Sequence, residues 1–406
     1  MPRWRALIVL LLALAPAVHA QPGVSAERLQ RLTDFLQADT APGGHLGAVA
    51  LVQRDGAVVY QRAFGQRDLA RREPMTTDTI FRIYSMTKPI ASVALLMLME
   101  EGKLALDDPL AQYLPEFAGQ RVWATPEWRA SARPVTLRLL LTHTAGFATG
   151  GGDAARSLLE AAAPWSASTL ADYARRVAGA PLAADPGTRF QYDGVNTEVL
   201  SRVIEVVAGE RFDAFLRRRI FGPLQMVDTG FSVPAAKRAR IADISAVGPA
   251  GTLVLAPGRS AAMPGEPLND YPSGAGGLYS TAADVLRFAR MLLGDGTLEG
   301  ARLLGRKTVE LMRSDQLAHL APIAGLSAGE GFGLGVSVVV DPAKRGRLAS
   351  AGAFGWTGAA STWFTIDPRE RMIAILLMQH LPRDGAPGEL PKPGIKFHNL
   401  VYQALD

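Results

Sequence analysis

Strand-like segments lie at both ends of this chain, and the segments between them have helical patterns. Near the N-terminus, Asp55-Gly56 joins two apolar runs, which is a strong signal for a β-hairpin. Near the C-terminus, residues 367–370 form a turn sequence between two further runs. Because strands are stable only when they pair, we expect the two ends of the chain to form one body. The predicted strands span residues 46–52, 57–60, 332–340, 361–366 and 372–379.

Helical apolar spacing marks residues 26–37 and several segments in the middle of the chain. One such face consists of Val199, Leu200, Val203, Ile204 and Val207. The chain has 406 residues, of which 48% are hydrophobic and 20% charged, so it can bury a sizeable core. We therefore predict an α/β (α+β) body from about 25–105 and 300–406, and a mainly helical region over about 106–299.

The first twenty residues have the pattern of a secretory signal peptide. Arg3 and Arg5 precede an apolar run over residues 6–15, and Val18 and Ala20 stand where a signal peptidase reads. The run has about half of the ~20 residues that a bilayer-spanning helix needs. We predict that residues 1–20 are removed, that residues 21–406 keep no stable membrane anchor, and that the protein is periplasmic or secreted.

Charge and cysteine content exclude several classes of partner and site. Removal of Arg3 and Arg5 lowers the formal charge from +5 to +3, and no long basic run remains, so we expect no nucleic-acid partner. The chain has no cysteine, which rules out disulfides, a catalytic thiol and thiolate metal sites. Because the histidines lack metal-ligand spacing, we also expect no metal site.

Ser85 and Lys88 lie three positions apart at the start of a predicted helix that runs to about residue 101. Residues at this spacing share a helix face, so the amine can contact the hydroxyl. A lysine amine that is neutral at the working pH can take the serine proton and generate a nucleophile. The same spacing also fits a helix-capping serine and a solvated lysine.

Two further segments carry groups that suit such a nucleophile. Tyr192 lies on a predicted loop before a helix, where its phenol can exchange a proton with a serine, although it can also simply anchor the loop. Residues 355–359 read Gly-Trp-Thr-Gly-Ala beside a predicted strand. Their paired glycines allow close backbone approach to an acyl group, or form a bulge beside a packed indole.

The order Ser85-x-x-Lys88, Tyr192, then Trp356-Thr357-Gly358 resembles serine hydrolases related to class C β-lactamases, most closely their family VIII carboxylesterase branch. The resemblance covers nearly the whole chain after residue 20. Supporting segments are 81–88, 101–104, 106–109, 140–146 and 276–281.

The resemblance implies an acyl-enzyme on Ser85, with Lys88 and Tyr192 exchanging its proton, and leaves open which of the two is the resting base. It implies an oxyanion hole from the backbone N–H groups of Ser85 and Ala359, and substrate binding by Trp356, Thr357 and Gly358. It further implies an α/β domain with an antiparallel sheet beside an all-α domain, and no metal or organic cofactor.

Two departures from the family pattern bear on the substrate. Penicillin-recognising relatives usually have Asn two residues after the tyrosine, where this chain has Gly194; whether Asp193 or Asn196 replaces it is open. They also usually have Lys or His at position 356, where a cation pairs with the substrate carboxylate. Because the indole of Trp356 is a neutral donor, we expect neutral esters as substrates rather than penicillins.

Other sequence features suggest rival sites. Residues 325–329 match the G-x-S-x-G pattern of α/β-hydrolases, but the glycine-rich segment that follows is poor helix material, so we predict a loop. His143 lies in a family segment and is predicted to be a structural histidine rather than a triad member.

The sequence thus predicts an exported serine hydrolase that cleaves carboxylic esters through an acyl-enzyme on Ser85. Its predicted partner is a small-molecule ester or β-lactam-like substrate. Two alternatives remain: a β-lactamase or D-alanyl-D-alanine peptidase of the same family, and a non-catalytic binder of cell-wall fragments with the same fold.

Overall fold

The computed structural model describes residues 23–124, 127–149, 154–385 and 387–406. The predicted signal peptide, residues 1–20, lies outside these ranges. In the part of the chain that is described, no helix is both long enough and apolar enough to cross a membrane.

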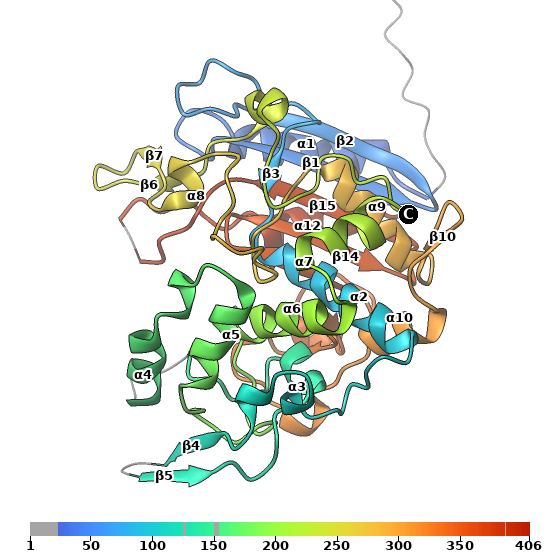
Figure 1. Ribbon diagram of the computed structural model, residues 1–406. Coiled ribbons are helices and arrows are strands. Elements are labelled where there is room, and N and C mark those ends of the chain that lie inside the picture. The colour runs from blue at the N-terminus through green and yellow to red at the C-terminus, as the bar shows by residue number, and fades with distance from the viewer. Residues whose placement is uncertain (1–22, 125–126, 150–153, 386) are drawn as a thin grey trace, which may run out of the picture.

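A seven-stranded sheet joins the two ends of the chain, visible as blue and red strands side by side in Figure 1. Its order is β11-β12-β13-β14-β15-β1-β2, and every neighbouring pair is antiparallel. β15 pairs with β1, with Ala48 opposite Met378 and Arg54 opposite Met372. The predicted α/β fold with an antiparallel sheet is confirmed. The strands are β1 (Gly47–Arg54), β2 (Ala57–Gly65), β11 (Glu330–Phe332), β12 (Ser337–Val339), β13 (Phe354–Gly358), β14 (Thr362–Asp367) and β15 (Met372–Met378).

Helices cover both faces of this sheet. α1 (Ala26–Asp39) and α12 (Gly394–Tyr402) pack on one face, where they meet the β1 side chains of Ala48, Ala50 and Val52. α2 (Thr87–Glu100) and α9 (Ala282–Leu293) belong to the core on the opposite face. Because successive strand side chains point to opposite faces and both faces are covered, the central strand β1 is apolar from Gly47 to Val52 rather than alternating.

Helices from residues 137–216 lie in the middle and lower parts of the molecule in Figure 1. They are α3 (Leu137–Leu141), α4 (Ala154–Ala162), α5 (Leu170–Ala178), α6 (Val195–Ala208) and α7 (Phe212–Leu216). α9 falls within the range expected for the helical region, yet it packs against β15 of the sheet. The remaining short elements are β3 (Phe81–Arg82), β4 (Arg121–Ala124), β5 (Glu127–Ala130), β6 (Ser245–Val247), β7 (Leu253–Leu255), α8 (Arg259–Ala262), β8 (Tyr279–Ser280), β9 (Thr297–Leu298), β10 (Ala301–Arg302), α10 (Arg306–Met312) and α11 (Pro342–Arg345).

Two turns show how local sequence shapes the sheet. Asp55 and Gly56 both have positive φ, 50° and 84°, as a two-residue hairpin loop requires, so the predicted β1–β2 hairpin is confirmed. The single strand predicted over residues 332–340 is wrong, because the chain turns between β11 and β12. At Gly335, φ is +84° and a Cβ would lie 2.0 Å from the Ser92 Oγ, so this turn packs directly on α2.

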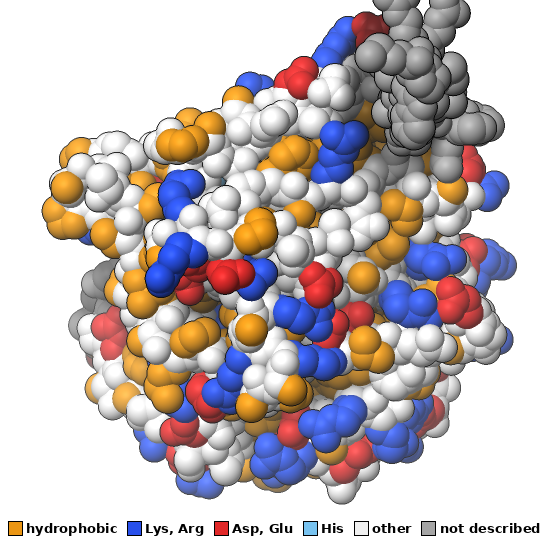
Figure 2. All heavy atoms as spheres, turned by 90° about the horizontal axis from the view of Figure 1, so that it is seen from above, with side chains coloured by type: hydrophobic (Ala, Val, Ile, Leu, Met, Phe, Trp, Pro, Cys, Tyr) orange, Lys and Arg blue, Asp and Glu red, His pale blue; other side chains and the backbone are white. Residues whose placement is uncertain are grey.

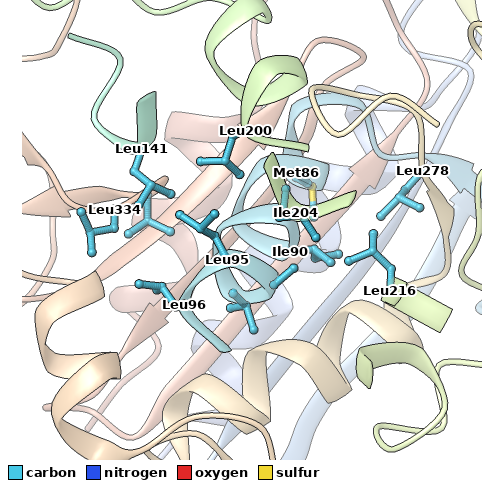
Figure 3. Packing of buried hydrophobic residues seen from close by; sticks show 14 of the residues in the cluster. Met86, Ile90, Leu95, Leu96, Leu141, Leu200, Ile204, Leu216, Leu278 and Leu334 are labelled. Atoms are coloured by element: carbon cyan, nitrogen blue, oxygen red, sulfur yellow. The ribbon is translucent and has the colours of Figure 1, made fainter. Parts of the chain in front are cut away.

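α2 lies at the centre of the core, as Figure 3 shows. Its Ile90, Leu95 and Leu96 are at most 2% exposed and lie among aliphatic side chains from α6 and other elements. Full burial of each such side chain contributes about 1.5–3 kcal/mol, so the position of α2 is strongly determined by packing. The partners labelled in the figure are Met86, Leu141, Leu200, Ile204, Leu216, Leu278 and Leu334.

Basic and acidic side chains are interspersed on the face shown in Figure 2. Many arginines pair with nearby carboxylates, such as Arg240 with Asp228 at 2.8 Å and Arg259 with Asp270 at 2.7 Å. Mixed charge of this kind produces no large field of one sign over that face.

Candidate active site

A strained turn between β3 and α2 presents Ser85. Residues Tyr84–Met86 form a single 3-10 turn, and Tyr84 has a φ of +44°, a left-handed value that is uncommon for a residue with a side chain. The strand before the turn is fixed by the Gln379 side chain, which accepts from the Arg82 N–H at 3.0 Å and donates to the Arg82 carbonyl at 3.1 Å. Such strain, of order 1–3 kcal/mol, persists only where surrounding structure enforces it.

Lys88 lies in the first turn of α2, directly beside Ser85. Its Nζ is 3.0 Å from the Ser85 Oγ and donates to the Ala275 carbonyl oxygen at 2.7 Å. Lys88 is only 4% exposed, whereas Ser85 is partly exposed. The structure therefore brings this pair together as the three-residue spacing predicts, with the hydroxyl open to a substrate and the amine shielded from water.

Tyr192 and Trp356 meet at the same place from distant parts of the chain. Tyr192 is on the loop before α6, and its ring centroid is 4.9 Å from the Lys88 Nζ. Trp356 is on β13, and its indole Nε1 donates a hydrogen bond to the Tyr192 phenol oxygen at 3.0 Å. This hydrogen bond fixes the phenol oxygen of Tyr192 beside the Lys88 amine.

The last residues of β13 lie against the turn that carries Ser85. A Cβ at Gly358 would be 2.3 Å from the Ile83 carbonyl oxygen, so only glycine fits this close approach. The Thr362 hydroxyl donates to the same carbonyl at 3.2 Å. Among the residues that the structure describes, the backbone N–H groups of Ser85 and Ala359 have no hydrogen-bond partner, which leaves both available to an oxyanion.

Thr357 differs from its neighbours in orientation. Trp356 lies opposite Phe364 in the β13–β14 pair, whereas Thr357 lies opposite Trp363, which packs on the α12 face of the sheet. Because side chains alternate along a strand, the exposed Thr357 side chain points away from the face that bears Trp356. Of the three predicted substrate-binding residues, Trp356 and Gly358 are the two on the Ser85 side.

His143 is buried behind the tyrosine. Its Nδ1 accepts from the Asp193 N–H at 3.4 Å, and its ring centroid is 4.7 Å from that of Tyr192. Burial, assisted by the nearby positive charge of Lys88, holds the pKa of His143 well below its usual value of 6.5. A neutral histidine that packs on Tyr192 agrees with the predicted structural role.

Asp193 and Asn196, the two candidates to replace the asparagine that relatives have at position 194, form hydrogen bonds with each other. Asn196 donates to Asp193 Oδ1 through its backbone N–H at 3.0 Å and its side-chain Nδ2 at 2.8 Å, and Thr149 donates to Asp193 Oδ2 at 2.7 Å. These bonds hold the tyrosine loop to the first turn of α6 and to the segment that contains Thr149. Within the described hydrogen bonds, neither Asp193 nor Asn196 contacts Lys88, whose second partner is the Ala275 carbonyl.

Two components of the site were not predicted from the sequence. The Ala275 carbonyl is a backbone group that carries no residue-type signal, although it directly precedes the quoted segment 276–281. Glu198 is 4% exposed and lies in the first turn of α6. Because acidic residues are common at helix starts as exposed charges, the sequence did not indicate that this one is buried. The only hint was its place directly before the apolar face that begins at Val199.

The rival motif at 325–329 forms part of a loop, as predicted. Ser327 is followed by β11 rather than by a helix, and its Oγ accepts from Arg347 at 3.2 Å. The same loop contributes apolar side chains that pack around Tyr192 and Trp356. In this cluster Phe190, Leu317 and Phe332 are buried, and Leu320, Ile323 and Leu326 are partly exposed.

This fold and this site define a serine hydrolase of the β-lactamase-related class. The profile of the family described as Beta-lactamase matches residues 32–391, and the chain belongs to that family. The resemblance predicted from the order of its motifs is confirmed.

Three similar proteins cover nearly all of the chain. Protein Rv1367c of Mycobacterium tuberculosis is 36% identical, over 88% of this chain and 94% of its own. Esterase EstB of Burkholderia gladioli is 33% identical, over 88% of this chain and 91% of its own. The solved structure of EstCE1, a hydrolase with promiscuous acyltransferase activity, superposes with a TM-score of 0.76 and 27% identity, covering 93% of this chain and 99% of that one.

Proposed function

We propose that the protein is an exported serine esterase that cleaves neutral carboxylic esters through an acyl-enzyme on Ser85. The observation that carries this proposal is the 3.0 Å contact between the Lys88 Nζ and the Ser85 Oγ, beside a tyrosine that accepts a hydrogen bond from Trp356. A lysine and a tyrosine next to one partly exposed serine are the groups that proton transfer to and from that serine requires.

In the proposed reaction, the Ser85 Oγ attacks the ester carbonyl carbon while its proton passes to the Lys88–Tyr192 pair. The oxyanion binds the N–H groups of Ser85 and Ala359, which are free in the described structure. The C–O bond to the alcohol breaks, and the departing oxygen takes up the proton. Water then attacks the acyl-enzyme with the same pair as base, releasing the acid and restoring Ser85.

The substrate class follows from what surrounds the serine. The indole of Trp356 is neutral, and its one N–H is engaged by Tyr192, so it cannot pair with a substrate carboxylate. Beside Tyr192 and Trp356, the partly exposed side chains of Leu320, Ile323 and Leu326 favour substrates whose acyl or alcohol part is apolar. The similarity to EstB, an esterase, and to EstCE1, a hydrolase, supports this choice. Export rests on the signal-peptide pattern of residues 1–20.

A substrate panel tests the proposal. We expect purified protein to hydrolyse p-nitrophenyl acetate, butyrate and octanoate, and to hydrolyse nitrocefin at least about 10²-fold less efficiently, because no cation is available at position 356. Ser85→Ala should abolish turnover of the esters. Ser327→Ala, which removes the loop serine of the rival motif, is the matched control and should retain full activity.

Three outcomes would contradict the proposal. Retained ester turnover in the Ser85→Ala variant would exclude Ser85 as nucleophile. Nitrocefin turnover equal to that of the esters would favour the β-lactamase or peptidase alternative. No turnover of any substrate would favour the non-catalytic binder.

A further inference from the structure

A buried carboxylate supports the backbone group that holds Lys88. Glu198, on α6, is 4% exposed and accepts a hydrogen bond from the Ser273 hydroxyl through Oε1 and from the Gly274 N–H through Oε2, the latter at 3.0 Å. The next residue, Ala275, supplies the carbonyl that accepts from the Lys88 Nζ at 2.7 Å. Glu198 is thus connected to Lys88 through the short segment Ser273–Ala275.

The segment between them fits closely against α6. A Cβ at Gly274 would lie 2.0 Å from the Ser201 Oγ and 3.2 Å from the Phe212 ring, so the backbone there lies directly on the helix. A Cβ at Gly194 would lie 3.4 Å from the Ala275 Cβ, which brings the segment beside the tyrosine loop as well. Without an acceptor at position 198, the Gly274 N–H and the Ser273 hydroxyl would be buried and unpaired, at about 1–3 kcal/mol each.

Glu198 and Lys88 also interact electrostatically. Burial raises the pKa of Glu198, the hydrogen bond from Ser273 and the positive charge of Lys88 lower it in part, and the net pKa is about 7. Tyr173 of α5 and Tyr271 face the same carboxylate, and its negative charge adds to the burial that raises the pKa of each phenol. Asp193, on the tyrosine loop, is a second buried carboxyl whose pKa is raised by burial and lowered in part by the charge of Lys88.

We propose that Glu198 is a positioning residue that fixes the Ser273–Ala275 segment and so keeps Lys88 against Ser85. Its charge also sets the pH above which the Lys88–Tyr192 pair takes the serine proton. This inference rests on the proposed function, because it assumes that the pair activates Ser85. Glu198 itself touches neither Ser85 nor the site of an acyl group in the described contacts, so its effect is transmitted through Lys88.

The test is the pH dependence of Ser85 labelling by a fluorophosphonate. In that reaction the Ser85 Oγ bonds to phosphorus, fluoride leaves, and the serine proton passes to the Lys88–Tyr192 pair, so the rate reports activation of the serine without any ester substrate. The second-order rate constant is measured between pH 5.5 and 9 for the wild type and for Glu198→Gln, Glu198→Asp and Glu205→Gln. Glu205 is the matched control, because it also lies on α6 and accepts from a backbone N–H, that of Phe212 at 3.1 Å.

We expect Glu198→Gln to move the acid limb of the profile to lower pH by about 1 unit, because loss of a negative charge disfavours the ammonium form of Lys88. Its labelling rate at pH 8 should fall about 10-fold, since a neutral amide holds the segment less firmly than a carboxylate. Glu198→Asp keeps the charge with a shorter reach, so it should slow labelling without moving the limb. Glu205→Gln should match the wild type.

A Glu198→Gln profile that coincides with the wild type would overturn the inference, as would an equal displacement in Glu205→Gln. If Glu198→Gln does not fold, a displaced acid limb in Glu198→Asp would overturn it, and an unmoved limb with slower labelling would support it. Failure of the wild type to label at all would instead overturn the proposed function. The two failures are therefore distinguishable.

Discussion

Replacing Lys88 with Met should lower kcat/KM for p-nitrophenyl butyrate by about 10³-fold or more, because the amine in contact with the Ser85 hydroxyl is lost. Methionine matches the length of the buried side chain, so the helix should persist. The Ala275 carbonyl loses a donor, which should cost about 1–3 kcal/mol of unfolding free energy. Steady-state kinetics and thermal unfolding followed by circular dichroism measure the two effects.

Lys103 supplies the control for this substitution. It follows the C-terminal end of α2, its side chain is 48% exposed, and it pairs with Glu101 at 2.9 Å. Exposed ion pairs contribute about 0–1 kcal/mol, so Lys103→Met should leave both kinetics and stability close to wild type. A Lys88→Met variant that keeps activity within 10-fold of wild type would contradict the role assigned to the amine.

Replacing Gly358 with Ala should reduce activity although it removes no polar side chain from the site. The added Cβ would lie 2.3 Å from the Ile83 carbonyl and 2.2 Å from the Thr362 Oγ1, so β13 must move away from the turn that carries Ser85. Displacement of this size, near 1 Å, typically costs about 10²-fold in rate. Overpacking should also lower the free energy of unfolding by about 1–3 kcal/mol.

Gly394→Ala is the matched control, because this glycine opens α12 and nothing lies within 4 Å of the position that a Cβ would take. Alanine there should leave activity unchanged and unfolding free energy equal or up to about 1 kcal/mol higher. Wild-type kinetics in Gly358→Ala, measured on the same ester, would show that β13 does not need to approach Ser85 closely.

Features encoded within a few residues were predictable from the sequence. The Asp55-Gly56 turn needs two residues that tolerate positive φ, and the Ser85–Lys88 contact needs only the geometry of one helical turn. Neither depends on the rest of the fold. The order of Ser85, Tyr192 and Trp356 along the chain indicated the family, and the family in turn predicts that these distant residues lie close together.

Features set by tertiary packing were not predictable. The run over residues 332–340 is apolar enough for one strand, yet it turns where the Gly333 N–H bonds to the Val336 carbonyl and Gly335 packs against Ser92 of α2. Glu198 has the sequence context of an ordinary helix-capping charge, and its role depends on a segment about 75 residues later that folds back onto α6. Long-range backbone contacts leave no residue pattern from which they can be read.

Covalent labelling tests the central claim, that Ser85 is a nucleophile activated by Lys88 and Tyr192, most directly. The wild type, Ser85→Ala and Lys88→Met are incubated with a fluorophosphonate at pH 8, and the adduct is located by peptide mass spectrometry. We expect one adduct per wild-type molecule, on the peptide that contains Ser85, no adduct on Ser85→Ala, and labelling of Lys88→Met slowed at least about 10²-fold. An adduct on any other residue, or unchanged labelling in the Ser85→Ala variant, would contradict the account.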